Sequence, residues 1–229
     1  MRTSEEYEMQ ERQLVSIDCA IFGYHEGELK LLLFHREKEP MIGHWSLVGG
    51  WVNGNESVDD AAQRVLQRIT GLNHIFMEQV SVFSDPQRDS GGRVISVLFY
   101  SLIVLNEQTM ALSNEFNAQW CSVNDLPQLI FDHNQMVDQA LAKLQQKASY
   151  SLIGRELLPQ NFTITQLRSL YDSIFNRTFD PGNFRKKVLS LGVLQRLDTK
   201  DNSESRKGAY YYCFNNNIIP ELSGNIIKL

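Results

Sequence analysis

The sequence predicts an α+β domain with a mixed sheet, followed by a smaller domain of two helices and a β-hairpin. Strand and helix patterns are mixed in the first 150 residues, without the regular alternation of a βαβ fold. After Lys147 the pattern loses its period and includes Gly154 and Pro159, so we expect domains at 1–150 and 151–229. The charge changes as well: residues 155–229 hold 11 Lys and Arg against 7 Asp and Glu, whereas 1–154 hold 11 against 20.

The overall composition is that of a soluble, folded protein. The 229 residues are 42% hydrophobic and 21% charged, with a net charge of −5. No apolar run approaches the roughly 20 residues that span a bilayer, and the acidic N-terminus does not resemble a secretory signal. The three cysteines, Cys19, Cys121 and Cys213, lack metal-binding spacing, so we expect reduced thiols in a cytoplasmic protein without membrane contact.

The elements of the first domain follow from short apolar runs and helix-end residues. A helix is predicted over 56–70, because Ser57 precedes apolar residues at helical spacing and Gly71 follows them. Asp132 and Gln135 have capping-box spacing, which predicts a second helix from Asp132 to about Lys147. Strands are predicted over 14–22, 28–34, 75–84, 93–105 and 118–123.

The second domain has the element order of a winged helix-turn-helix. Thr163 and Gln166 form a second capping-box pattern before a helix with one apolar face. Asp180 and Pro181 suit the start of the next helix, and Gly192 suits its end. Two β-rich segments around a polar turn then predict a wing.

One face of the second helix is predicted to bind DNA. Phe184, Val188 and Leu191 form the expected buried face, and polar or basic residues surround them. Recognition helices present such a face to the major groove, and basic wing residues contact phosphates. The alternative is a helix face that is merely solvated. The candidate DNA-binding residues are Asn183, Arg185, Lys186, Lys187, Arg206 and Lys207.

Residues 50–72, GWVNGNESVDDAAQRVLQRITGL, resemble the Nudix box. The matching positions are Gly50, Glu56, Arg64, Leu66, Gly71 and Leu72. This resemblance implies an α/β/α Nudix fold with a mixed sheet.

The box lacks three of its four glutamates, which are replaced by Val65, Arg68 and Ile69. Nudix hydrolysis needs Mg²⁺ held by carboxylates on one helix face, and here that face carries two aliphatic residues and a cation. We therefore predict no catalytic residues, no metal, no cofactor and no enzyme activity. The resemblance implies that Glu56 and Arg64 pair as a structural clasp.

Residues 157–189 resemble the C-terminal domain of the Nudix-related transcriptional regulators, and the resemblance extends from Leu14 to Phe214. It implies a regulator with a degenerate Nudix domain that senses a small molecule and a winged helix that binds operator DNA. The expected assembly is a homodimer on a near-palindromic operator.

The effector is predicted from the branch of that family. Stretches such as GHWSLVGGWV, ESVDDAAQRVL, TGL, MEQV and LPQLIFDH resemble the arabinose-responsive branch of Bacteroidetes-type bacteria. L-arabinose, and hence a role in carbohydrate metabolism, is the resulting prediction, with ADP-ribose and NAD metabolism as the alternative. Whether the effector releases or promotes DNA binding, and whether the protein represses or activates, stays open.

The ligand pocket of a Nudix fold lies beside the box helix. Trp45 could offer a flat face to a sugar or could be a core aromatic, and Arg36 and Arg93 could be solvated strand residues. Because Asp132 is expected to cap its helix, its neighbour His133 is the stronger candidate for a ligand contact. The candidate ligand-binding residues are Arg36, Trp45, Arg88, Arg93 and His133.

Two other functions remain open. An active Nudix hydrolase with a regulatory domain would need metal ligands outside the box, for example Glu115 or Glu78. A ligand-binding adaptor without DNA contact would leave the basic helix face unexplained.

Overall fold

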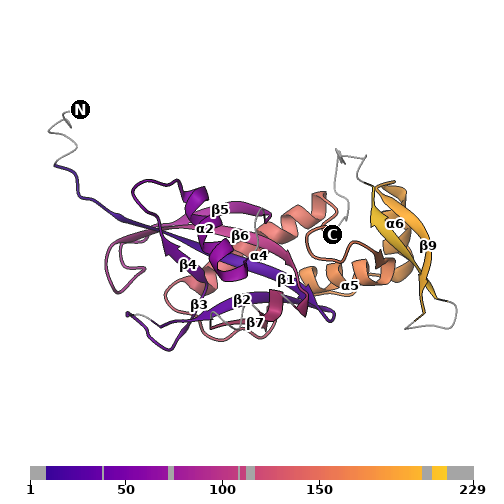
Figure 1. The fold of residues 1–229 in the computed structure, drawn as a ribbon, viewed down its shortest axis with the longest axis horizontal. Coiled ribbons are helices and arrows are strands. Elements are labelled where there is room, and N and C mark those ends of the chain that lie inside the picture. Colours follow the sequence, from indigo (N-terminus) through magenta and orange to yellow (C-terminus); the bar gives the residue numbers. More distant parts are fainter. Residues whose placement is uncertain are drawn as a thin grey trace.

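The computed structural model describes residues 9–37, 39–71, 75–107, 109–111, 117–202 and 208–215. A mixed seven-stranded sheet with helices on both faces forms the first domain, and a winged helix-turn-helix follows it (Figure 1). Both parts of the predicted fold class are thereby confirmed. In the described ranges, no helix is long and apolar enough to cross a membrane.

The large sheet is built around its first strand. The strand order is β3-β2-β1-β6-β5, with β4 added to β1 and β7 added to β2. The pairing of β1 with β6 is parallel, and all the other pairs are antiparallel. The strands are β1 (Leu14–His25), β2 (Glu28–His35), β3 (Trp45–Ser46), β4 (Val48–Trp51), β5 (Met77–Phe83), β6 (Val94–Val104) and β7 (Ala118–Ser122).

Helices α2 (Val58–Thr70) and α4 (His133–Tyr150) cover opposite faces of this sheet. Alternate residues of β1 belong to different cores: Ile17 packs with α2, and Ala20 packs with α4. Two local signals fix the ends of α2. Ser57 forms a capping box with Asp60, and Gly71 ends the helix with a φ of 67°.

The start of α4 corrects one prediction. The Asp132 side chain makes no capping hydrogen bond. Both its carboxylate oxygens instead accept hydrogen bonds from the Arg88 guanidinium, at 2.8 and 2.7 Å. The capping-box prediction was wrong because this bidentate, charge-assisted pair holds the carboxylate away from the helix amides.

The winged helix has a three-stranded sheet of order β8-β10-β9. The predicted capping box of Thr163 and Gln166 is present at the first helix, and the Asp180 carboxylate accepts from the Asn183 amide at the second. The predicted wing residues Arg206 and Lys207 lie outside the described residues. The elements are β8 (Phe162–Thr163), α5 (Ile164–Phe175), α6 (Pro181–Ser190), β9 (Leu194–Asp201) and β10 (Ala209–Phe214).

A continuous apolar core joins the two parts, since buried residues of α4, α5 and α6 belong to one cluster. The Gln145 amide of α4 donates to the Ile174 carbonyl of α5 at 2.9 Å. Ser173 of α5 donates through its hydroxyl to the Gly27 carbonyl and accepts from the Leu29 amide. Helix α5 therefore packs against both α4 and the β1–β2 hairpin (Figure 1). The domain boundary at residue 150 stays a prediction.

Candidate ligand pocket and nucleic-acid interface

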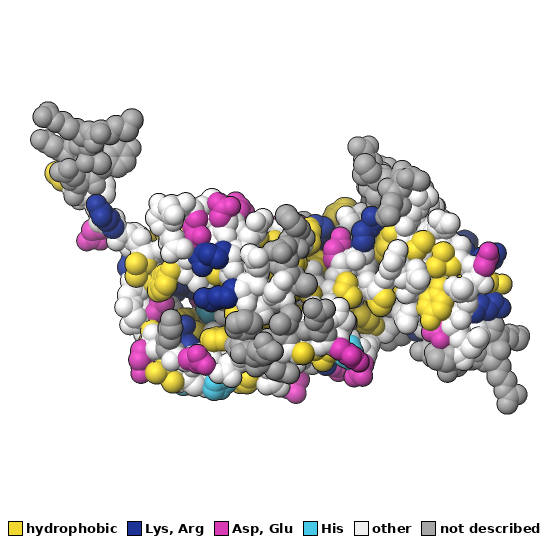
Figure 2. Space-filling model, in the orientation of Figure 1, with side chains coloured by type: hydrophobic (Ala, Val, Ile, Leu, Met, Phe, Trp, Pro, Cys, Tyr) yellow, Lys and Arg dark blue, Asp and Glu magenta, His cyan; other side chains and the backbone are white. Residues whose placement is uncertain are grey.

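A cavity of about 600 Å³ lies beside the box helix α2. Figure 2 shows it as a hollow in the first domain with basic side chains at its edge. Its walls come from β1, the end of β2, β4, α2 and the segments around residues 88 and 131. The lining residues used below are Asp18, Arg36, Trp51, Arg64, Val65, Arg68, Arg88, Asp89, Phe131 and His133.

Two adjacent glycines let the walls approach one another. A Cβ at Gly50 would lie 2.8 Å from the Val65 side chain of α2, and a Cβ at Gly49 would overlap the Asp18 carboxylate. Strand β4 therefore fits between the box helix and β1 only because both positions lack a side chain.

The Glu56–Arg64 clasp is confirmed. Arg64 donates to both oxygens of Glu56, at 2.9 and 2.5 Å, and to the Trp51 carbonyl at 2.9 Å. These hydrogen bonds from Arg64, with a further one from the Asn53 amide, lower the pKa of Glu56 to about 2. The clasp fixes the end of β4 against α2, which places Trp51 at the rim of the cavity.

The box positions that lost their glutamates do not form a metal site. Val65 and Ile69 are buried in the core shared by α2 and the sheet, and Arg68 is exposed and lines the cavity. Among the described residues, no group of three His, Cys, Asp or Glu side chains could hold a metal ion. The donor set therefore does not fit the Mg²⁺ that Nudix hydrolysis requires.

The alternative metal ligand Glu78 lies elsewhere. Its carboxylate accepts from Lys147 at 2.9 Å, pairs with Lys143 at 3.2 Å and does not line the cavity. The other candidate, Glu115, lies outside the described residues.

A buried polar network forms the floor of the cavity. Arg88, which is 3% exposed, binds Asp132 and lies 4.0 Å from Asp18. The Ser96 hydroxyl donates to Asp18 at 2.5 Å. This network connects β1, β6 and the start of α4.

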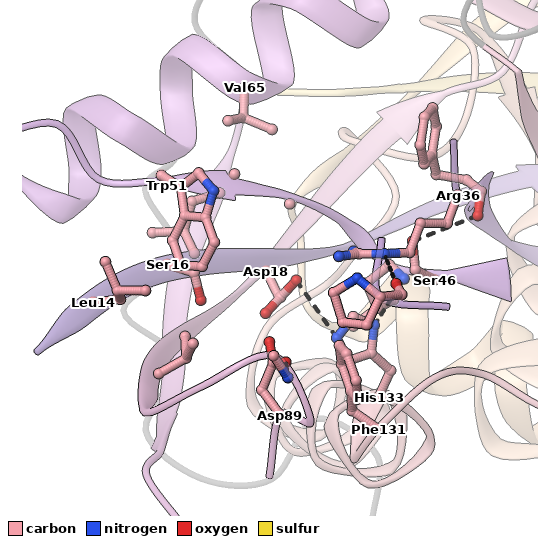
Figure 3. A pocket seen from close by; sticks show the side chains of 18 of the residues that line it. Leu14, Ser16, Asp18, Arg36, Ser46, Trp51, Val65, Asp89, Phe131 and His133 are labelled. Atoms are coloured by element: carbon pink, nitrogen blue, oxygen red, sulfur yellow. Dashed lines mark hydrogen bonds and ion pairs between the residues drawn. The ribbon is translucent and has the colours of Figure 1, made fainter. Parts of the chain in front are cut away.

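His133 completes the floor as a neutral donor. Its Nδ1 accepts from the Leu47 backbone amide at 3.1 Å, and its Nε2 lies 3.8 Å from Asp18 Oδ1. Burial lowers the pKa of His133, so the ring is neutral at pH 7. Because Nδ1 accepts a hydrogen bond, the single ring proton is on Nε2, which faces Asp18 (Figure 3).

Three of the five predicted ligand residues meet at this cavity: Arg36, Arg88 and His133. Trp45 does not line it and packs edge-on against His35, with ring centroids 4.8 Å apart. Arg93 also lies outside the lining, and its guanidinium donates to the Ser84 carbonyl.

Among the lining residues that the sequence interpretation did not name as ligand contacts are Asp18, Trp51, Arg68 and Phe131. Asp18 had a usable signal, because it is the one charged residue within an otherwise uncharged and mostly apolar strand segment, LVSIDCAIF. Trp51 directly follows the glycine pair and could have been found from its position beside the box helix.

The predicted division of α6 into two faces is confirmed for Phe184 and Val188, whereas Leu191, the third residue predicted to be buried, is only half-buried at the end of the helix. Phe184 and Val188 are buried, and Phe184 packs against Tyr171 and Phe179. Arg185 also contacts the wing sheet, where its guanidinium donates to the Tyr212 hydroxyl at 3.3 Å. The exposed polar and basic side chains of α6 are Asn183, Arg185, Lys186, Lys187 and Ser190.

The chain matches two family models. Residues 13–143 match the NUDIX domain, and residues 154–214 match the NrtR DNA-binding winged helix domain. It is 28% identical over 202 residues to the ADPR responsive transcriptional repressor NtrR of Acinetobacter baylyi, covering 86% of this chain and 81% of the relative. It is 35% identical over 118 residues to an ADP-ribose pyrophosphatase of Methanocaldococcus jannaschii, covering 52% and 69%.

One solved structure resembles both parts of the chain, and another resembles the first part alone. Shewanella oneidensis NrtR complexed with a 27mer DNA has a TM-score of 0.79 and 27% identity, covering 88% of this chain and 93% of that one. The NUDIX domain of the same protein complexed with ADP ribose has a TM-score of 0.52 and 28% identity, covering 62% and 99%.

Proposed function

The chain belongs to the Nudix domain family and carries a winged helix domain of the NrtR type, and from this premise we propose an ADP-ribose-responsive transcriptional regulator. Its architecture is that of the Nudix-related transcriptional regulators, which are DNA-binding proteins. The proposed site of action is operator DNA in the cytoplasm.

ADP-ribose replaces L-arabinose as the proposed effector. The Acinetobacter relative is named as responsive to ADPR, and the Nudix domain of the Shewanella relative was solved with ADP ribose. The arabinose prediction, and with it the role in carbohydrate metabolism, receives no support from these similarities. It rested on the resemblance of short stretches of sequence alone.

The cavity suits a ligand with a diphosphate and an aromatic base. Its volume of about 600 Å³ is in the usual range for small-molecule sites. Arg64 and Arg88 each pair with a carboxylate. The other two arginines that line the cavity are Arg68, which is exposed, and Arg36, whose guanidinium donates to the Pro40 and Glu39 carbonyls. The last two arginines are therefore the proposed diphosphate ligands.

Trp51 and Phe131 are the proposed contacts for the base. Trp51 is 53% exposed at the rim, and Phe131 lies under the Arg36 guanidinium, 5.9 Å from ring centroid to Cζ. Aromatic rings gain from stacking on a flat base. Arg88 and His133 are the proposed ligand contacts at the floor of the cavity.

The replaced box glutamates carry the proposal that this pocket binds its ligand without hydrolysing it. Where an enzyme holds Mg²⁺, the helix presents Val65, Arg68 and Ile69. The similarity to an ADP-ribose pyrophosphatase keeps hydrolysis as the second candidate function.

The DNA side of the proposal rests on α6. Its exposed residues Asn183, Arg185, Lys186 and Lys187 are offered to the major groove, with a homodimer bound to a near-palindromic operator. Two copies of α6 would then contact successive half-sites.

Calorimetry and a hydrolysis assay test the proposal together. The full-length protein should bind ADP-ribose, should not bind L-arabinose, and should change its affinity for a fragment of its own promoter when ADP-ribose is added. With Mg²⁺ or Mn²⁺ it should release no AMP. Turnover on the order of 1 s⁻¹ would identify an enzyme and overturn the sensor proposal. Binding of arabinose alone would restore the other effector.

A further inference from the structure

The Asp18 carboxylate at the floor of the cavity has unused hydrogen-bonding capacity. Its side chain is 10% exposed and lines the cavity. Among the described residues, the Ser96 hydroxyl is the one donor within hydrogen-bond distance, at 2.5 Å. Arg88 and His133 lie at 4.0 and 3.8 Å, which is close enough to offset the charge but too far for a hydrogen bond.

An ionised carboxylate accepts about four hydrogen bonds, and a desolvated carboxylate that lacks them is unfavourable. No fully buried side-chain nitrogen or oxygen in the described part of the chain lacks a partner. The free positions of Asp18 are therefore the ones open to the cavity. Figure 3 shows this carboxylate directed into the space between Trp51 and Arg36.

The surroundings of Asp18 select the chemical group that would bind there. A cation would meet the Arg88 guanidinium and the neighbouring Arg36. The His133 Nε2–H beside Asp18 is a donor that needs an acceptor. A hydroxyl group satisfies both, because it donates to the carboxylate and accepts from the ring. Two neighbouring hydroxyls can engage both carboxylate oxygens.

We propose, resting on the proposed function, that Asp18 accepts hydrogen bonds from neighbouring hydroxyls of the terminal ribose of ADP-ribose, and that His133 Nε2–H donates to one of the same oxygens. The sugar then lies at the floor, and the walls are left to the diphosphate and the base. Asp18 thereby makes the pocket specific for the ribosylated nucleotide over the plain diphosphate.

The wild-type protein alone provides the first test. By calorimetry, the full-length chain should bind ADP-ribose at least tenfold more tightly than ADP, which lacks the terminal ribose. Equal affinities for the two ligands would overturn the Asp18 assignment and leave the effector proposal standing. A chain that binds neither ligand would instead overturn the proposed function.

Asp18→Asn is the second test, with Asp89→Asn as the matched control. Asp89 lines the same cavity, and its carboxylate accepts a hydrogen bond from the Gly91 amide at 2.7 Å. Asp18→Asn should reduce the preference for ADP-ribose over ADP to about twofold or less while ADP binds as before, which also shows that the pocket is intact. Asp89→Asn should leave the preference unchanged, because the proposed contacts to the terminal ribose are made by Asp18 and His133 and not by Asp89. A wild-type preference in Asp18→Asn would overturn the proposal; should that variant not fold, the wild-type comparison decides.

Discussion

At the scale of single residues, the box keeps the side chains that hold the backbone and has lost those that hold a metal. Glu56 and Arg64 remain as a clasp between β4 and α2, whereas Val65 and Ile69 have joined the core. The same substitution leaves Arg68 on the cavity wall. The helix carries a cation at a position where a Nudix enzyme has a carboxylate, so it favours an anionic ligand over a metal ion.

The clasp makes the stability of the protein depend on pH in a specific window. The Glu56 pKa falls from its ordinary value of 4.5 to about 2 on folding, chiefly through the hydrogen bonds from Arg64. Because the folded pKa is the lower one, the clasp stabilises the fold fully above about pH 4.5 and is lost as the pH falls toward 2. In urea unfolding between pH 7 and 2.5, the free energy of unfolding should therefore decrease less for Glu56→Gln than for the wild type.

The control for this measurement is Asp59→Asn on the same helix, since Asp59 forms no ion pair in the described ranges. It should reproduce the wild-type pH profile. If Glu56→Gln does so too, the clasp contributes nothing to the acid sensitivity of the fold.

At the scale of elements, local signals predicted a helix cap correctly where the capping partner is near in sequence. They failed where the side chain pairs with a distant residue. Ser57 and Thr163 cap their helices as their sequence neighbours predict, because the partner lies three residues away. Asp132 has the same local pattern, but its partner Arg88 lies 44 residues upstream. No pattern within one helix could reveal that pairing.

The cavity was only partly predictable for a similar reason. Arg36, Arg88 and His133 could be named from their place in a Nudix fold, whereas Asp18 depends on the pairing of β1 with β4. That register sets Asp18 opposite Gly49, where the missing side chain leaves room for the carboxylate. Register between strands 31 residues apart is a tertiary property.

Helix α6 yields the prediction for DNA binding. Lys186 and Lys187 are exposed beside the buried Phe184, so replacing both with alanine should weaken binding to all sequences. If each lysine holds one phosphate, the slope of log K against log salt should become shallower by about 2. Mobility shifts at several salt concentrations would measure it. An unchanged slope in a folded double variant would mean that α6 does not hold the phosphates.

Two controls accompany that series. Lys143→Ala removes a lysine that pairs with Glu78 in the first domain and should leave the salt slope unchanged. Phe184→Ala should cost roughly 3–5 kcal/mol and unfold the winged helix, because that ring is buried against Tyr171.

At the scale of the whole molecule, two elements connect the cavity to the winged helix. Helix α4 begins at His133 in the cavity floor and reaches α5 through Gln145. Strand β1 carries Asp18 in the same floor, and the hairpin that follows it contacts Ser173 of α5. A ligand at the floor therefore touches both elements on which α5 rests.

This arrangement predicts that effector and operator affinities are coupled, and that Ser173 takes part. By linkage, the factor by which ADP-ribose changes operator affinity must equal the factor by which operator DNA changes ADP-ribose affinity, typically about 5- to 150-fold.

Ser173→Ala removes two hydrogen bonds between α5 and the hairpin. We expect the coupling factor to fall toward one, by about two- to thirtyfold. Affinity for each ligand alone should change little. The matched control, Ser101→Ala, loses a hydrogen bond to the Phe76 carbonyl within the first domain and should keep the wild-type factor. Calorimetry of ADP-ribose with and without operator gives the factor directly. A Ser173→Ala variant with full coupling would show that the hairpin contact only holds the domains together, and that α4 alone carries the effect of the ligand.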